Sequence, residues 1–142
     1  MKNMKDPSQT EEPTVLQTLG RGNLLASECP SRVVLKHLTS RWGVLVLIAL
    51  QGGTHRFSDL RRKIGGVSER MLAQTLQFLE ADGIVLRRDF QVVPPHVDYS
   101  LTPLGEEAAA QVRCLADWIE TNLPQIGKNW ADGSIVVDRD KA

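Results

Sequence analysis

The sequence predicts an α+β fold that is mostly α-helical, and three stretches carry the prediction. Residues 57–79 have the pattern of two short helices joined by a Gly-Gly turn. Residues 84–101 have the pattern of two β-strands joined by a proline-rich loop, and residues 103–123 that of a long closing helix. This order of elements is that of a winged helix-turn-helix with an added C-terminal dimerisation helix.

The part of the chain before residue 40 should hold two short helices after a polar start. Residues 1–14 are polar and contain two prolines, which is typical of a disordered arm. Residues 16–26 have leucines at helical spacing and predict a short helix, although two glycines weaken the pattern. Pro30 suits the first position of a second helix, and this places Cys29 at its N-cap.

The next helix is the most apolar part of the chain. It should begin after Ser40, which can cap it, and end at Gly52-Gly53. Because its apolar residues lie almost all round, we expect a buried core helix. The apolar run of residues 44–50 is far too short to span a bilayer. Residues 54–56 could add a short strand to the ribbon that follows.

Each helix of the helix-turn-helix has a buried face and an exposed face. In the first helix, Phe57, Leu60 and Ile64 recur at helical spacing. Gly65-Gly66 ends this helix, since glycine readily adopts left-handed conformations, and Ser68 can cap the next one. In the second helix three leucines face inward, and the opposite face carries Glu69, Arg70, Ala73, Gln74 and Gln77.

This exposed face has the chemistry of a surface that reads DNA bases. Arg can bond guanine and Gln can bond adenine with paired hydrogen bonds, and each pair discriminates bases by about 1–3 kcal/mol. The alternative for this helix alone is a solvated helix in an unrelated small bundle. The ribbon that follows favours DNA binding. The residues that we expect to contact DNA from this helix are Ser68, Glu69, Arg70, Gln74 and Gln77.

Further side chains could contact the DNA backbone. Arg62 and Lys63 belong to a basic run that could equally be an ordinary solvated face, and Arg88 and His96 lie on or beside the wing. The formal net charge is zero, but the segment 29–103 holds ten Lys and Arg against six Asp and Glu. The basic excess therefore lies in the segment that is expected to meet double-stranded DNA.

The closing helix has a strong start and a long apolar stripe. Thr102 suits the N-cap and Pro103 the first position, and two acids follow near the positive end of the helix dipole. Pro124 is expected to end the helix. The stripe consists of Ala108, Val112, Leu115, Ile119 and Leu123.

This stripe predicts a homodimer. One small domain would leave part of it uncovered, so we expect it to form a dimer interface together with residues 16–25. A long helix that only caps its own domain is the alternative. The domain would then span residues 15–124, and residues 125–142 would form a loose tail.

A series of short motifs occurs in a fixed order along the chain. They are Cys29-Pro30, Trp42, Arg56–Leu60, Ser68–Leu72, Asp82-Gly83, Val93–Tyr99 and Leu101–Gly105. Over about residues 24–123 the chain resembles the HxlR-type winged-helix regulators, which are similar in shape to the MarR proteins. The resemblance implies a dimeric transcriptional regulator that binds operator DNA. It also implies a role for Cys29, because a cysteine at this position often senses quinones, aldehydes or oxidants in that family.

The residues around Cys29 leave two interpretations open. A thiol at a helix N-cap faces unpaired backbone amides and the positive dipole end, which favour the reactive thiolate. Alternatively, Cys29 is a buried, unreactive small hydrophobe. Cys114 lies in the closing helix, where it could form an intersubunit disulfide with an oxidised Cys29 or remain a packed, inert core or interface residue.

Several other classes of protein are not favoured by the sequence. Two cysteines and three histidines show no metal-ligand spacing, and no phosphate loop or catalytic triad has positional support. We therefore expect neither an enzyme nor a cofactor. The first residues do not resemble a signal peptide, so we expect a cytoplasmic protein that meets no membrane. Two alternatives stay open: a winged helix controlled by a non-covalent small-molecule inducer, and a protein–protein interaction module without DNA binding.

Overall fold

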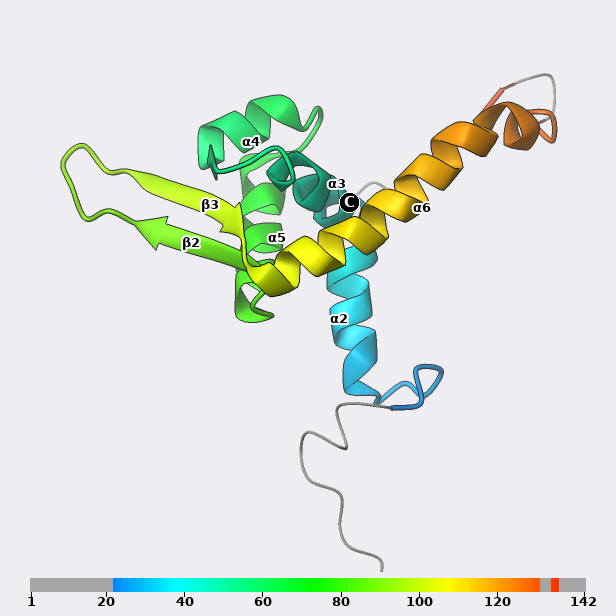
Figure 1. The fold of residues 1–142 in the computed structure, drawn as a ribbon, viewed down its shortest axis with the longest axis horizontal. Helices are drawn as coiled ribbons and strands as arrows, with labels where there is room; N and C mark the ends of the chain where they lie inside the picture. Colours follow the sequence, from blue (N-terminus) through cyan, green and yellow to red (C-terminus); the bar gives the residue numbers. More distant parts are fainter. Residues whose placement is uncertain (1–21, 131–133, 136–142) are drawn as a thin grey trace, which may run out of the picture. The chain divides into compact units, whose positions relative to one another are not determined.

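The computed structural model describes residues 22–130 and 134–135. The chain divides into two compact units, Met1–Leu35 and Lys36–Ala142, and each is treated by itself. Figure 1 labels the elements. In chain order they are α2 (Pro30–Thr39), α3 (Arg41–Leu50), β1 (His55–Arg56), α4 (Phe57–Lys63), α5 (Glu69–Ala81), β2 (Val85–Asp89), β3 (Val97–Leu101) and α6 (Pro103–Gly127).

The described part of the first unit consists of turns followed by the start of α2. Helix α2 begins at Pro30, as the sequence predicts. The helix predicted for residues 16–26 is wrong for its last five residues, which are not helical and include a turn at residues 24–25. The side chain of Asn23 accepts a hydrogen bond from the backbone N–H of Leu25 at 3.2 Å, and such local bonds compete with helix formation. Residues 16–21 and the predicted arm 1–14 lie outside the described residues.

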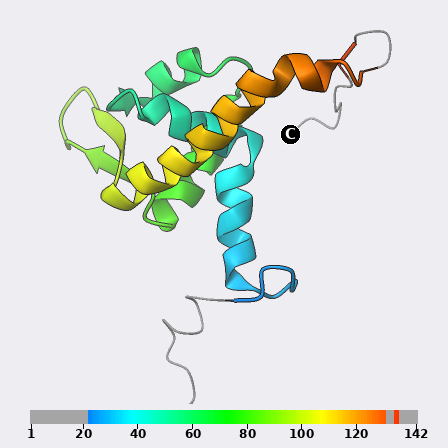
Figure 2. The same ribbon diagram turned by 45° about the vertical axis from the view of Figure 1, so that its right-hand side comes forward.

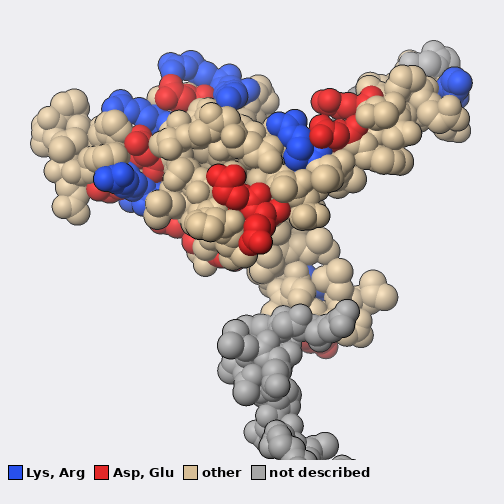
Figure 3. All heavy atoms as spheres, viewed as in Figure 1, with Lys and Arg blue, Asp and Glu red and all other residues tan. Residues whose placement is uncertain are grey.

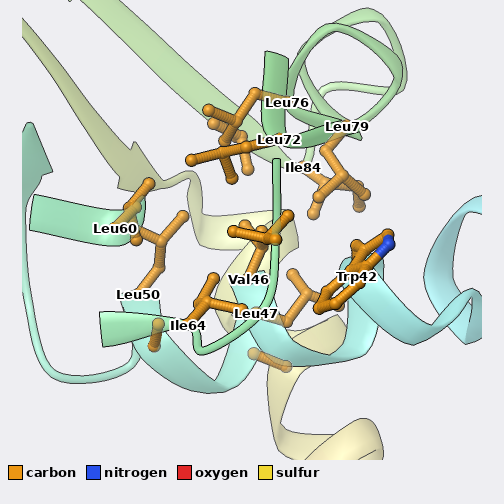
Figure 4. Close-up of a cluster of buried hydrophobic side chains, with 14 residues drawn as sticks. Trp42, Val46, Leu47, Leu50, Leu60, Ile64, Leu72, Leu76, Leu79 and Ile84 are labelled. Carbon is orange, nitrogen blue, oxygen red and sulfur yellow. The ribbon is translucent and has the colours of Figure 1, made fainter. Parts of the chain in front are cut away.

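Helix α3 is the centre of the core, as its apolar sequence predicts. Ser40 caps it by accepting a hydrogen bond from the backbone N–H of Gly43 at 3.1 Å. Figure 4 shows its inner side chains meeting leucines from α4 and α5. The buried cluster is Trp42, Val46, Leu47, Ala49, Leu50, Leu60, Ile64, Val67, Leu72, Leu76, Leu79, Ile84, Val85 and Ala109.

The helix-turn-helix is confirmed. Helix α4 buries Leu60, and Gly66 makes the turn with a φ of +86°, a left-handed conformation that suits glycine. The Ser68 hydroxyl then caps α5 by accepting a hydrogen bond from the N–H of Met71 at 3.1 Å. Because both ends of the turn are fixed, α5 is held at a set angle on the core.

The ribbon is confirmed as an antiparallel wing with a third, short strand. The strand order is β1-β3-β2, with Val85 opposite Leu101 and Asp89 opposite Val97. Strand β1 adds Arg56 opposite Asp98, as expected for residues 54–56. Figure 1 shows β2 and β3 extending from the helices as a long hairpin.

Helix α6 joins the root of this wing. The Thr102 hydroxyl accepts a hydrogen bond from the N–H of Gly105 at 2.9 Å and donates to the carbonyl of Gly83 at 2.6 Å. The predicted end at Pro124 is wrong, because the helix runs on to Gly127 with Pro124 inside it. Proline acts on the turn before it, where it removes one backbone hydrogen bond and its ring meets the carbonyl four residues earlier, so the residues after it can remain helical. In Figures 1 and 2 the C-terminal half of α6 projects beyond α3, α4 and α5.

Among the described helices, none alone is long and apolar enough to cross a membrane. The bent pair of α2 and α3 passes the same test only when the two are taken together, and only by length and composition. Helix α3 is largely buried in the core, as expected for a core helix.

Candidate nucleic-acid interface

The outer face of α5 carries the residues that the sequence assigns to base contacts. Ser68, Glu69, Arg70, Gln74 and Gln77 are all exposed, whereas the opposite face is buried as Leu72, Thr75, Leu76 and Leu79. With a rise of about 1.5 Å per residue, Arg70 and Gln77 lie about 10 Å apart along the helix axis. The face therefore spans several base pairs of a major groove.

The residues of this face differ in how they are already bonded. Glu69 accepts a hydrogen bond from Arg61 of α4 at 3.1 Å, and Ser68 is occupied by its capping bond. Within the described residues, no hydrogen bond or ion pair holds the side chains of Arg70, Gln74 and Gln77. These three side chains can therefore bond a ligand without first losing a protein partner, while Glu69 and Ser68 fix the start of the helix.

The basic run of α4 lies beside the start of α5. Arg61, Arg62 and Lys63 are exposed, and the guanidinium of Arg62 donates to the carboxylate of Asp59 one turn earlier. Lys63 Nζ lies 3.3 Å from His55 Nε2 on β1. In Figure 3 blue spheres gather over α4 and beside the hairpin, whereas red spheres lie over the start of α6. Surface pairs of this kind are weak, so phosphate oxygens can compete for these cations.

The wing is stiffened by a chain of polar contacts around His96. Its Nδ1 lies against the guanidinium of Arg56, and its Nε2 is 2.7 Å from Asp98 Oδ1. Since a guanidinium can only donate, Nδ1 accepts, and Nε2–H donates to the carboxylate. His96 also meets the ring of Phe90 edge-on, with centroids 4.5 Å apart. His96 therefore has a structural position in the wing in addition to the DNA contact expected of it.

Arg88 is positioned by an aromatic ring on the outer part of β2. Its guanidinium carbon lies 4.6 Å from the ring centroid of Phe90, within cation–π range, and the residue is exposed. The ring supports the side chain but leaves its N–H donors available to a phosphate.

The sequence did not single out Arg56 as part of this surface. It holds His96 through the pairing of β1 with β3, a contact between residues 40 positions apart. Apart from its place in the motif Arg56–Leu60, the indication in the sequence was the short strand expected at residues 54–56. Its register, which places Arg56 opposite Asp98, is a tertiary property that local patterns do not carry.

The two cysteines have opposite surroundings. Cys29 is buried at 7% exposed, and its backbone carbonyl accepts a hydrogen bond from the N–H of Arg32 at 2.9 Å, as expected next to a helix start. Cys114 is exposed on α6. Both are free thiols, and no group of three or more His, Cys, Asp or Glu in the described ranges could hold a metal ion.

This geometry agrees with a family model that describes an HxlR-like helix-turn-helix and matches residues 37–127. The chain belongs to the HxlR-like helix-turn-helix family. The match runs from the end of α2 to the end of α6, so it includes the reading face, the wing and the closing helix.

Individual relatives of this HxlR-like chain are regulators. It is 69% identical over 110 residues to the HTH-type transcriptional regulator YtfH of Escherichia coli (strain K12). This alignment covers 78% of this chain and 87% of that protein. A solved structure described as a transcriptional regulator, ytfH from Salmonella typhimurium, is 70% identical with a TM-score of 0.72, covering 75% of this chain and 95% of that chain. The structure of the redox regulator HypR in its reduced form is 34% identical with a TM-score of 0.63. The match covers 68% of this chain and 96% of that chain.

The family membership confirms the class of protein that the sequence predicts. The chain is an HTH-type transcriptional regulator with a winged-helix fold of the HxlR and MarR type. Its family binds DNA through the helix-turn-helix, so α5 and the wing are the elements to consider for contact with nucleic acid.

Proposed function

We propose that this regulator binds a palindromic DNA operator as a homodimer, with one copy of α5 in each of two successive major grooves. The observation that carries the proposal is the exposed face of α5, where Arg70, Gln74 and Gln77 have no protein partner among the described residues. These side chains would bond base edges, with Ser68 and Glu69 at the start of the same helix. A two-fold dimer would set the half-sites one helical turn apart, about 34–36 Å.

The phosphate contacts would come from the cations around this face. Arg62 and Lys63 of α4 and Arg88 of the wing are exposed, and His96 holds the wing in position beside them. Neutralising phosphates releases counterions, so operator affinity should fall as salt rises. These contacts would supply affinity for any DNA, and α5 would select the sequence.

Support for the dimer comes from α6. Apolar side chains of its second half are exposed along one helix, and exposed apolar patches of this kind mark interaction surfaces. In a two-fold pair the same stripe would meet its own copy. Residues 16–25 were also predicted to join the dimer interface, but most of them lie outside the described residues.

Base contact and phosphate contact can be separated by two arginine variants. Genomic fragments that the purified protein retains would be sequenced to define the operator, and affinities measured on operator and random DNA at several salt concentrations. Arg70→Ala should cost about 1–3 kcal/mol on the operator and less on random DNA. Arg88→Ala should weaken both equally and lower the salt slope by about one. If Arg70→Ala lowers the affinity for operator and for random DNA equally, Arg70 only positions the protein on DNA. If the protein retains no genomic fragment, a protein-binding module is favoured.

We further propose that oxidants or electrophiles regulate this dimer through Cys29. The chain is similar to HypR, a redox regulator whose reduced and oxidised forms have both been solved. Cys29 lies next to the start of α2, and Cys114 on α6 is exposed and available to a second thiol. Diamide should change operator affinity in the wild type and not in Cys29→Ser, while Cys114→Ser tests whether a disulfide takes part. Unchanged wild-type binding after diamide would refute this regulation.

A further inference from the structure

The tip of the wing is an apolar surface that the contacts proposed above leave unused. Between β2 and β3 the chain runs through the wing tip, residues 90–95, in which Gln91 is the only polar residue. Val93 is 97% exposed and Val92 is 50% exposed, so folding buries little of either side chain. In Figure 3 the end of the hairpin shows only tan spheres on this face, whereas blue spheres lie nearer the helices. Contiguous apolar groups that stay in water at a projecting point mark a surface that contacts another molecule.

The wing tip is held in shape by local hydrogen bonds. The N–H of Phe90 donates to the carbonyl of His96 at 3.0 Å and closes the loop. Gln91 reverses the chain in a left-handed conformation with a φ of +53°, and its N–H donates to Asp89 Oδ1 at 2.8 Å. The two prolines after Val93 each fix a further φ. Because the tip is already ordered, it loses little conformational entropy when it meets a partner.

The positive charge of the wing lies behind the tip and not on it. Residues 89–97 contain no Lys or Arg, and Arg88 directly precedes them. The guanidinium carbon of Arg88 lies 4.6 Å from the ring centroid of Phe90, so the charge is held at the base of the tip. The minor groove of DNA has phosphates along its rims and sugars and base edges inside it. An apolar tip with a cation behind it matches this order, because the apolar groups enter the groove while the cation stays beside a phosphate.

We propose that the wing tip enters the minor groove next to each half-site and that Val93 wedges into a base step there, which bends the operator. Apolar side chains inserted in this way partly unstack the step and kink the duplex by about 20–90° toward the major groove. Val93 is the most exposed of the large apolar residues in the described ranges, and the prolines after it stiffen the tip. This inference rests on the proposed function, because α5 must first bring the wing against the duplex.

The wedge gives the operator a sequence preference at a position where no hydrogen bond reads a base. Pyrimidine–purine steps such as TA and CA are flexible and easily kinked, whereas A-tracts are stiff. The free energy needed to open the step therefore depends on its sequence. Operators should carry a flexible step outside the base pairs that α5 contacts. Replacing that step with an A-tract should weaken binding several-fold.

Bending can be measured on an operator fragment that carries a fluorescent donor at one end and an acceptor at the other. Binding of the full wild-type chain should raise the energy transfer, because a kinked duplex brings its ends closer together. A fluorescent purine analogue that brightens when it is unstacked would be placed in turn at each step beside the half-sites. It should brighten at one step on each side. A bound operator that stays straight, with every step stacked, would overturn the wedge and leave the proposed function intact.

Two variants of Val93 test the chemistry of the wedge. Val93→Ser makes the side chain polar and should lose most of the bend and of the brightening, with a several-fold lower operator affinity. Val93→Leu keeps an apolar side chain and should retain both signals. Because valine contacts no phosphate, Val93→Ser should leave the salt slope unchanged, unlike Arg88→Ala. The control is Leu86→Ser on β2, where the side chain is 51% exposed but lies outside the wing tip, and it should bend the operator normally.

Three further results would overturn the wedge. A bend that persists in Val93→Ser would have its origin in another part of the protein. Equal loss of bending in Val93→Ser and Val93→Leu would show that the tip needs the shape of valine and not its apolar character. If the protein binds no DNA at all, the proposed function fails together with the wedge, whereas a bound but straight operator removes only the wedge.

Discussion

The two halves of α6 carry one apolar stripe but have different surroundings. In the first half, Gly105 and Ala109 are buried, and Ala108 and Val112 pack against the core. In the second half, four large apolar side chains are 43–57% exposed within the described chain. These are Leu115, Trp118, Ile119 and Leu123.

The comparison separates what periodicity specifies from what it leaves open. The spacing of the stripe requires that one face of the helix be apolar along its whole length. It does not say what covers that face. The wing root and α3 cover the first half, since α6 contacts both α3 and β3. The second half extends past α3, where apolar side chains can leave water only by meeting another surface.

The difference between the two halves of α6 is tested most strongly by replacing one glycine in each half with alanine, which adds one methyl group. A Cβ on Gly105 would overlap the carbonyl oxygen of Ile84 and come within 2.9 Å of its carbon. Because a backbone cannot move aside as a side chain can, Gly105→Ala should lower the free energy of unfolding by about 1–3 kcal/mol. Urea denaturation followed by circular dichroism measures this.

Gly127 at the other end of α6 is the matched control. A Cβ there would lie 3.4 Å from the ring of Trp130, which is close to ordinary contact. Alanine is also the better helix former, so Gly127→Ala should stay within about 0.5 kcal/mol of the wild type or exceed it. Equal losses from both substitutions would mean that the first half of α6 is not packed as tightly as the contact with Ile84 requires.

The same distinction explains which features could be predicted from the sequence. The starts of α2, α3, α5 and α6 were predictable, because Pro30 suits a first helical position and the caps Ser40, Ser68 and Thr102 act on amides within their own turn. The turn at Gly66 was predictable for the same local reason. The buried and exposed faces of α5 followed from helical spacing.

Features that depend on distant partners were not predictable. The bond between Arg61 and Glu69 and the contacts of His96 join elements whose relative placement no local pattern gives. The wrong end at Pro124 has another cause: a proline disturbs the helical turn before it, and the residues after it can stay helical.

A charged side chain in the second half of α6 should affect folding less than Gly105→Ala does. It should have a large effect on assembly. Ile119→Asp places a carboxylate in the centre of the exposed stripe, where its side chain is 43% exposed in the single chain. In a two-fold interface the change occurs twice, and each unpaired charge would be buried at a cost of several kcal/mol. The dimer should therefore dissociate.

The control for this change is Thr121→Asp, which adds the same charge at an exposed position of the same helix outside the stripe. Sedimentation velocity should give twice the 15.8 kDa chain mass for the wild type and Thr121→Asp, and the single chain mass for Ile119→Asp. Helix content should be unchanged in both, since neither side chain belongs to the buried core. A monomeric wild type would remove the dimer and the palindromic operator together. A dimer that survives Ile119→Asp would move the interface to another surface and leave the reading face of α5 intact.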